Sequence, residues 1–167
     1  INLITVKGSI IEDLPKKSDF YQDILFYENQ FNGIMPLEIM VDTQKKGGVY
    51  QPKTLNRINL LQEEILSIPE LSTPISVVSV IKYAKQSYYN GNSEYYSLPT
   101  AQERGFIGKY IKNSIHKGHD VLSSYTDSTG RYARITSYMK DMPTQKIEEI
   151  EQRLESKSAE IFPKEQY

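Results

Sequence analysis

The sequence predicts an α+β fold, a two-layer sandwich in which helices cover one face of an antiparallel sheet. Three patterns favour this class. Residues 37–41 alternate between two faces, as a half-buried strand does, and residues 55–68 repeat apolar side chains at helical spacing. Residues 121–126 and 131–139 are β-like runs on either side of a polar Asp-Ser-Thr-Gly loop, which is typical of a hairpin.

The first element after an extended arm at residues 2–15 is a short amphipathic helix. Ser18 can cap its N-terminus, and apolar side chains recur at three-to-four spacing until Gly33 ends the pattern. The strand at residues 37–41 follows. Its Glu38 lies on the face opposite the apolar one.

A second helix and a second strand come next. Thr54 can cap the helix of residues 55–68, which Pro69 ends. Residues 75–79 are short and rich in β-branched side chains, so we predict a strand there, and the pattern turns helical from Ile81 onward.

The rest of the chain predicts a loop, a helix, the hairpin and a closing helix. Residues 88–99 contain a turn signal, and residues 100–114 form a helical patch. After the hairpin, Pro143 suits the first turn of a helix that ends before Pro163.

This order of elements predicts a ferredoxin-like split βαβ sandwich with a helical insertion at about residues 81–118. Residues 1–33 would be a connecting arm and entry helix, and residues 34–167 the α/β subdomain. The last strand of such a fold is missing. We therefore expect the chain to be a segment of a longer protein, with an open sheet edge near Tyr167.

Composition excludes several functions. The 20 Lys and Arg residues balance 21 Asp and Glu residues, so no net field attracts nucleic acid. The chain has no Cys, which excludes thiol chemistry and cysteine-ligated zinc. Its longest apolar run is far shorter than a membrane span requires. We expect neither a nucleic-acid partner nor a cofactor.

The two histidines are the one candidate metal site. His116 and His119 stand three residues apart and could bind a metal with Asp120. Gly118 weakens a helix at this point, and two solvated loop histidines are the simpler interpretation. Because no nucleophile motif accompanies them, we expect no metal site and no catalytic residues, and hence no enzyme.

A tyrosine cluster leaves two alternatives open. Tyr88, Tyr89, Tyr95 and Tyr96 flank an Asn-Gly-Asn turn. Their rings could pack the insertion onto the sheet, which we favour, or they could form a ligand or partner surface. The second alternative corresponds to an extracellular glycan- or protein-binding module.

Several segments resemble a known family. Residues 12–18 (Glu-Asp-Leu-Pro-Lys-Lys-Ser), 27–33 (Tyr-Glu-Asn-Gln-Phe-Asn-Gly) and 35–42 (Met-Pro-Leu-Glu-Ile-Met-Val-Asp) resemble the first extracytoplasmic loop of RND-superfamily exporters. The likeness is to the lipid-exporter branch related to the mycobacterial large membrane proteins and the hopanoid transporters. Residues 127–135 (Asp-Ser-Thr-Gly-Arg-Tyr-Ala-Arg-Ile) are similar to the hairpin of that family.

The resemblance implies a periplasmic porter domain inserted between two transmembrane helices of a bacterial inner-membrane exporter that is driven by the proton-motive force. Its partners would be the transmembrane helices and second porter domain of the same chain and a lipophilic small molecule or lipid. A homo-oligomer is compatible with it. The family's proton-relay residue lies in a membrane helix and has no counterpart here.

We predict that the helix-free sheet face contacts the second porter half or the substrate path. Its residues are Glu38, Met40, Tyr132, Arg134 and Tyr138.

Overall fold

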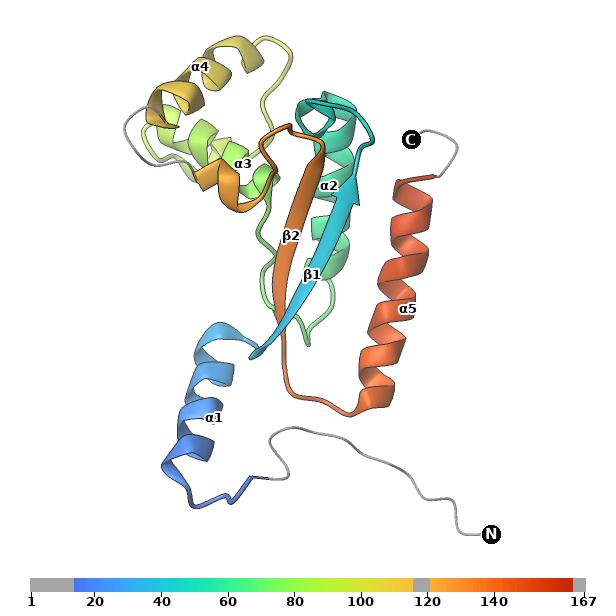
Figure 1. The fold of residues 1–167 in the computed structure, drawn as a ribbon. Helices are drawn as coiled ribbons and strands as arrows, with labels where there is room; N and C mark the ends of the chain where they lie inside the picture. Colours follow the sequence, from blue (N-terminus) through green and yellow to red (C-terminus); the bar gives the residue numbers. More distant parts are fainter. Residues whose placement is uncertain (1–13, 116–120, 164–167) are drawn as a thin grey trace. The chain divides into compact units, whose positions relative to one another are not determined.

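The computed structural model describes residues 14–115 and 121–163, and this part of the chain is a mixed α+β structure with five α-helices and a two-stranded antiparallel sheet (Figure 1). The predicted α+β class is therefore confirmed. The helices are α1 (Asp19–Phe31), α2 (Pro52–Leu66), α3 (Val77–Tyr88), α4 (Arg104–Ile115) and α5 (Thr144–Ile161); the strands are β1 (Met35–Asp42) and β2 (Tyr132–Met139); and the short 3-10 helices are η1 (Gly48–Tyr50), η2 (Ser93–Tyr95) and η3 (Val121–Ser124).

The ends of α1 follow the predicted signals. The side chain of Ser18 accepts a hydrogen bond from the backbone N–H of Tyr21 at 3.2 Å, which satisfies one donor of the first turn. Asn32 follows the helix in the left-handed region, with φ of 56°. Gly33 has φ of 151°, and a Cβ there would lie 2.7 Å from the carbonyl carbon of Met139, so only glycine fits.

The predicted strand at residues 75–79 is wrong, because α3 begins inside it. The Ser76 side chain accepts from the Val78 N–H at 3.0 Å, and the Ser79 hydroxyl accepts from the Ser76 N–H at 3.2 Å. This capping box starts a helix whose first residues, Val77 and Val78, are buried. The extended part of the segment lies earlier, at residues 71–75.

The first predicted strand of the hairpin, residues 121–126, is also wrong. Residues Val121–Ser124 form η3, and the N–H groups of Tyr125 and Thr126 both donate to the Leu122 carbonyl at 2.9 Å. One bridge, between Thr126 and Ala133, is all that remains of the expected pairing. The second predicted strand is confirmed as β2.

The structure divides into two compact units, and β1, α2 and β2 each contribute residues to both. The described part of unit 1 consists of residues 14–37, 63–74 and 137–163. In it, the Arg153 Nε atom lies 2.7 Å from Glu64 Oε1.

The boundary predicted at residues 33 and 34 stays a prediction. The buried apolar side chains of unit 1 are Ile65, Ile68, Leu71, Met142, Ile150, Leu154 and Ile161.

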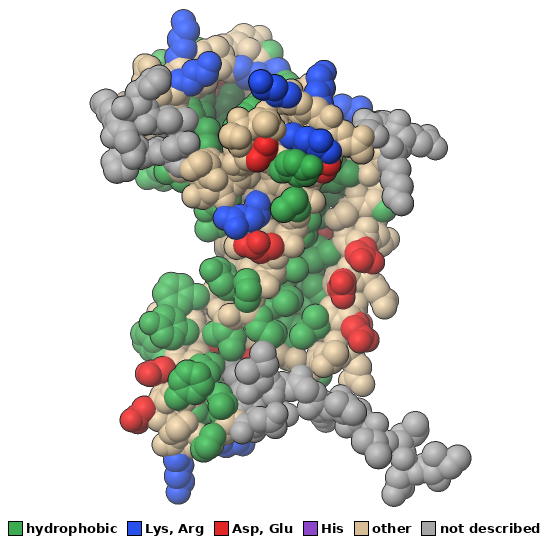
Figure 2. Space-filling view, viewed as in Figure 1, with side chains coloured by type: hydrophobic (Ala, Val, Ile, Leu, Met, Phe, Trp, Pro, Cys, Tyr) green, Lys and Arg blue, Asp and Glu red, His purple; other side chains and the backbone are tan. Residues whose placement is uncertain are grey.

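Helix α1 in unit 1 carries an exposed aromatic surface. It has no buried residue, and Phe20, Phe26, Tyr27 and Phe31 are each more than half exposed. Figure 2 shows hydrophobic side chains gathered over this helix. The rings of Tyr27 and Phe31 stack on each other, with centroids 5.7 Å apart.

The described part of unit 2 consists of residues 38–62, 75–115 and 121–136. Helices α3 and α4 lie side by side in it (Figure 1). In β2, Ala133 and Ile135 are buried while Arg134 between them is exposed, as the period of a half-covered strand requires. The buried apolar side chains of unit 2 are Val41, Val49, Ile58, Leu61, Val77, Val78, Ile81, Ile107, Ala133 and Ile135.

Over residues 14–115 and 121–163, none of the helices combines the length and the apolar character that crossing a membrane requires.

Candidate ligand-binding cavity

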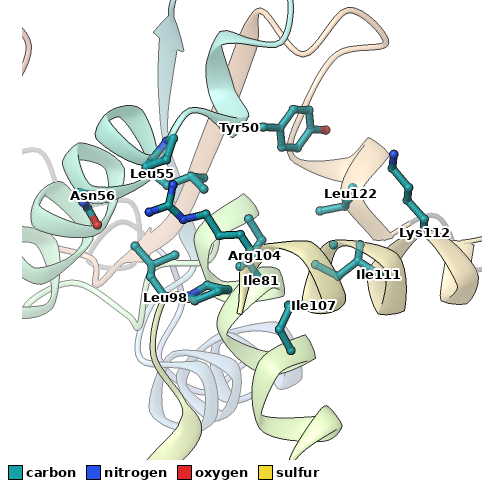
Figure 3. A pocket seen from close by; sticks show the side chains of 13 residues that line it. Tyr50, Leu55, Asn56, Ile81, Leu98, Arg104, Ile107, Ile111, Lys112 and Leu122 are labelled. Carbon is teal, nitrogen blue, oxygen red and sulfur yellow. The ribbon is translucent and has the colours of Figure 1, made fainter. Parts of the chain in front are cut away.

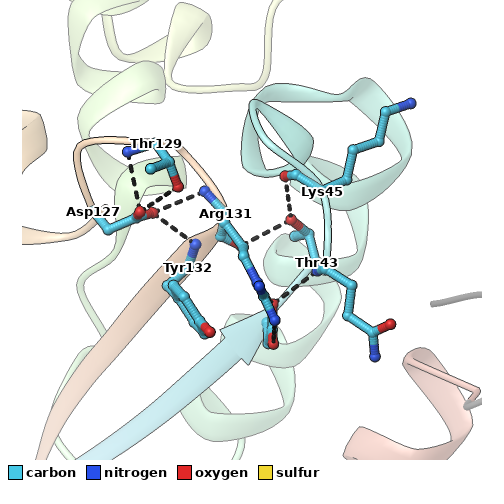
Figure 4. Close-up of polar contacts among 8 residues, drawn as sticks. Thr43, Lys45, Asp127, Thr129, Arg131 and Tyr132 are labelled. Carbon is cyan, nitrogen blue, oxygen red and sulfur yellow. Dashed lines mark hydrogen bonds and ion pairs between the residues drawn. The ribbon is translucent and has the colours of Figure 1, made fainter.

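A turn centred on Asp127 connects η3 to β2 (Figure 4). The Asp127 carboxylate accepts hydrogen bonds from the Thr129 hydroxyl, from the Thr129 N–H at 3.0 Å, and from the N–H groups of Arg131 and Tyr132, both at 2.8 Å. These donors, the Thr129 hydroxyl first, lower the pKa of Asp127 to about 2. The carboxylate is therefore ionised at neutral pH and holds the turn closed.

Arg131 joins this turn to the end of β1. Its Nε and Nη2 atoms lie 2.7 and 2.6 Å from the two carboxylate oxygens of Asp42, in a bidentate pair. Hydrogen bonding from Arg131 lowers the pKa of Asp42 and, in return, raises that of Arg131. The Thr43 hydroxyl also donates to the Arg131 carbonyl at 2.8 Å.

The same turn positions Tyr50. Gly130 has φ of +67°, and a Cβ at this residue would lie 2.9 Å from Tyr50 Cε2, so the ring rests against bare backbone. The hydroxyls of Tyr50 and Thr126 are 3.1 Å apart, and the Val49 N–H donates to the Gly130 carbonyl at 3.0 Å. As a result, the loop after β1 and the turn before β2 hold one aromatic ring in a fixed place.

A buried ion pair clips the loop before α4 onto α3. Lys85 Nζ lies 2.9 Å from Glu103 Oε2, and the two side chains are only 6% and 13% exposed. Glu103 also accepts from the Thr100 N–H at 2.8 Å and the Tyr89 hydroxyl at 3.1 Å. These bonds, that of Lys85 above all, lower the pKa of Glu103 to about 2. The start of α4 is thereby anchored.

The predicted tyrosine cluster lies beside this clip. The rings of Tyr89 and Tyr95 stack with centroids 4.0 Å apart, and Tyr88 meets Tyr89 edge-on at 5.3 Å. Tyr88 also contacts Phe106 and Tyr110 of α4, with centroids 5.1 and 5.6 Å apart. These contacts pack α3, α4 and the loop that joins them against one another, within the insertion. Packing of the rings onto the sheet stays a prediction.

Part of the cluster remains accessible. Tyr88 and Tyr96 are exposed, and Lys82 Nζ lies 5.7 Å from the centre of the Tyr96 ring. The structure therefore brings Tyr88, Tyr89 and Tyr95 together and leaves Tyr96 apart. A ligand or partner surface on these rings stays a prediction.

A mostly apolar cavity of about 480 Å³ opens in unit 2. This volume falls within the range of small-molecule sites. Figure 3 shows side chains from α2, α3, α4 and η3 turned toward it, with Tyr50 and Leu98 completing the wall. The aliphatic side chains that line it include Leu55, Ile81, Leu98, Ile107, Ile111 and Leu122.

Three polar side chains, Asn56 of α2 and Arg104 and Lys112 of α4, also line the cavity. All three are exposed, and none forms a side-chain hydrogen bond or ion pair with a described residue. In Figure 3, Arg104 reaches from α4 toward Leu55 and Asn56, whereas Lys112 lies at the far end beside Leu122. The cavity therefore combines an apolar wall with two positive charges that no acidic side chain of the described residues pairs.

The residues predicted for the open sheet face are accessible. In unit 2, Glu38, Met40 and Arg134 are exposed and Tyr132 is half-buried, and Glu38 pairs with Arg134 at 3.3 Å. In unit 1, Tyr138 is exposed. Their contact with a second porter half or a substrate path stays a prediction.

His116, His119 and Asp120 lie outside the described residues. Within the ranges that the structure describes, no three His, Asp or Glu side chains gather closely enough to hold a metal ion.

Sequence reasoning missed the cavity. The available signal was α4, which carries Arg104, Lys109 and Lys112 without an acidic residue and places Ile107 and Ile111 one turn apart. The residues that line the cavity with these two isoleucines lie as far as 61 residues away, at Tyr50, and leave no local pattern.

No protein-family model, no curated protein and no solved structure matches this chain.

Proposed function

We propose that this chain is the soluble porter domain of a proton-motive-force-driven RND-type exporter, on the periplasmic side of a bacterial inner membrane, and that it forms part of the path for lipophilic or lipid-like substrates. The cavity carries the proposal. Its volume of about 480 Å³ suits one small molecule, and its aliphatic wall suits an apolar one. The sequence resemblance described above points to the same function independently.

Strand pairing is compatible with the ferredoxin-like sandwich that the proposal includes. Residues 71–75 run antiparallel to β2, with bridges from Leu71 to Met139 and from Ile75 to Thr136. The backbone N–H and carbonyl of Thr136 form hydrogen bonds with Ile75. The backbone N–H and carbonyl groups of the neighbouring odd-numbered residues of β2 point the other way, toward β1. β2 would thus be the third strand of the fold, between the first strand and a short second one.

The unpaired edge of β1 among the described residues is compatible with the last strand that a ferredoxin-like sandwich would place there. Among the described residues, β1 pairs with β2 alone, so its other edge has no partner strand. In a ferredoxin-like sandwich the last strand would pair there, after a helix in the position of α5.

The proposed mechanism is conformational. A rigid soluble unit in such a transporter moves against its neighbour and thereby opens or closes a path. The exposed Met40 and the Glu38–Arg134 pair give the sheet a surface that a second porter domain could cover. Proton coupling would take place in membrane helices and not in this segment.

The test has a genetic part and a transport part. The reading frame should continue into apolar segments of about twenty residues on both sides of this chain. Cells should then retain a fluorescent lipophilic dye when the full-length transporter carries Ile107→Lys, which places a charge in the cavity wall. Tyr83→Ser, on the exposed side of α3, should export normally at equal expression. A frame without flanking apolar segments, or undiminished export by Ile107→Lys, would refute the proposal.

A further inference from the structure

The charges on the cavity wall have one sign. Arg104 and Lys112 both line the cavity, and neither side chain has an acidic partner among the described residues. Helix α4 itself contains three cations and no acidic residue. A ligand that places a negative charge here would gain electrostatic stabilisation, whereas a neutral or cationic one would not.

Arg104 is the better of the two positions for an anion. It is the first residue of α4, where the helix dipole adds positive potential. The nearest carboxylate in sequence, Glu103, is already bound to Lys85 at 2.9 Å and so does not neutralise the guanidinium. The guanidinium can donate two parallel hydrogen bonds to a carboxylate, and the Asn56 amide, drawn at the same end in Figure 3, offers a further donor.

The remaining wall suits an alkyl chain. Ile81, Ile107 and Ile111 follow one another along the cavity between the Arg104 end and the Lys112 end (Figure 3). Ile107 is almost completely buried, so its side chain forms the floor, and Leu122 lines the far end. An apolar chain that leaves water for this wall gains free energy with each methylene group.

We propose that the cavity binds an amphiphile that has one anionic head group, with the head on Arg104 and the alkyl chain among Ile81, Ile107 and Ile111. This deepens the proposed function, because it names the chemical class of the lipophile, and it rests on that function for the ligand's biological role.

The binding test uses the purified 167-residue chain and three probes with the same alkyl chain: decanoate, 1-decanol and decyltrimethylammonium. Isothermal titration calorimetry at neutral pH should show decanoate binding about tenfold tighter than 1-decanol, since a charge-assisted hydrogen bond contributes on that order. Decyltrimethylammonium should bind more weakly than 1-decanol. Equal affinity for the three probes, or no binding of decanoate, would overturn the inference.

Two matched variants locate the head group. Arg104→Gln should weaken decanoate about tenfold and leave 1-decanol within about twofold. Lys112→Gln removes the same charge from the other end and should change decanoate by less than about threefold. An equal loss in both variants would mean a general field and would overturn the assignment to Arg104. Both side chains are exposed, so folding should be kept, as far-UV circular dichroism will show.

The binding experiment and the transport experiment can refute their two proposals independently of each other. Selective decanoate binding by a chain whose gene has no flanking membrane segments would support the cavity assignment and refute the exporter. If the transporter exports the dye but its purified domain does not bind decanoate, the result would support the exporter function and refute the proposal of an anionic ligand.

Discussion

The buried ion pair between Lys85 and Glu103 gives the most quantitative prediction. In Glu103→Gln, the amide oxygen can replace Oε2 and keep the hydrogen bond from the Thr100 N–H, and the amide NH2 can donate to the Tyr89 hydroxyl in place of Oε1, but the negative charge is lost. Lys85 then keeps neutral acceptors alone, Ser97 Oγ at 3.1 Å and the amide oxygen, while its side chain stays 6% exposed. The variant thus isolates the cost of an uncompensated buried cation.

That cost should be large. Removal of one partner of a buried pair destabilises a protein by about 3–5 kcal/mol, because the other charge remains desolvated. Glu103 retains some solvent contact, so we expect the lower value, about 3 kcal/mol. Replacing both members, as in Lys85→Met with Glu103→Leu, should recover about 1 kcal/mol or more of this loss, because no unpaired charge is then left.

The pH dependence follows from the pKa of Glu103, which lies at about 2 in the folded chain against 4.5 ordinarily. Because folding lowers this pKa, the carboxylate stabilises the protein fully above about pH 4.5, and the stabilisation is lost as the pH falls toward 2. The difference in unfolding free energy between wild type and Glu103→Gln should therefore be constant at neutral pH and narrow below pH 4.5.

Urea unfolding followed by tyrosine fluorescence and far-UV circular dichroism will measure this difference. The chain has 13 Tyr and no Trp, and Tyr89, whose ring stacks on that of Tyr95, donates a hydrogen bond to Glu103. Glu160→Gln is the matched control, because its pair with Lys157 is exposed on α5 and should contribute less than about 0.5 kcal/mol. A loss below about 1 kcal/mol in Glu103→Gln, or one that persists at pH 2, would refute the reasoning.

Three further variants test the core, the turn and the sheet face. Ile58→Ala removes a fully buried side chain of α2 and should lower the unfolding free energy by about 3 kcal/mol in urea. Gly130→Ala should cost about 1–2 kcal/mol through its positive φ and, because its Cβ would press on Tyr50, should also weaken decanoate binding in calorimetry. Met40→Glu, at a side chain 70% exposed, should change the stability of the isolated chain by less than about 0.5 kcal/mol but abolish dye export in the full transporter.

The elements that the sequence predicted correctly are those with local boundary signals. Ser18 and Gly33 bracket α1, and Pro69 follows the turn that ends α2. Caps and prolines act within a few residues, so their effect can be recognised without knowledge of the partner surfaces. The fold class followed from these elements because their order leaves few ways to bury the apolar faces.

The two misassigned strands show where local patterns fail. Val77 and Val78 favour a strand by propensity, but the Ser76 capping box, a local signal that the sequence reasoning overlooked, and the burial of both valines, a tertiary effect, favour a helix. Residues 121–126 had the composition of a strand, yet among them Thr126 alone bridges β2, at Ala133, and Val121–Ser124 form η3. Composition by itself does not separate these two local structures.

The cavity lay beyond sequence reasoning because its shape depends on two polar anchors whose partners are brought together only by the tertiary structure. The Lys85–Glu103 pair fixes where α4 starts, and the Asp127 turn fixes where Tyr50 stands. Each anchor looks in sequence like an ordinary charged residue in a loop. The same reasoning predicts how the site can be lost: a variant that breaks either anchor should reduce ligand binding although it replaces no residue of the cavity wall.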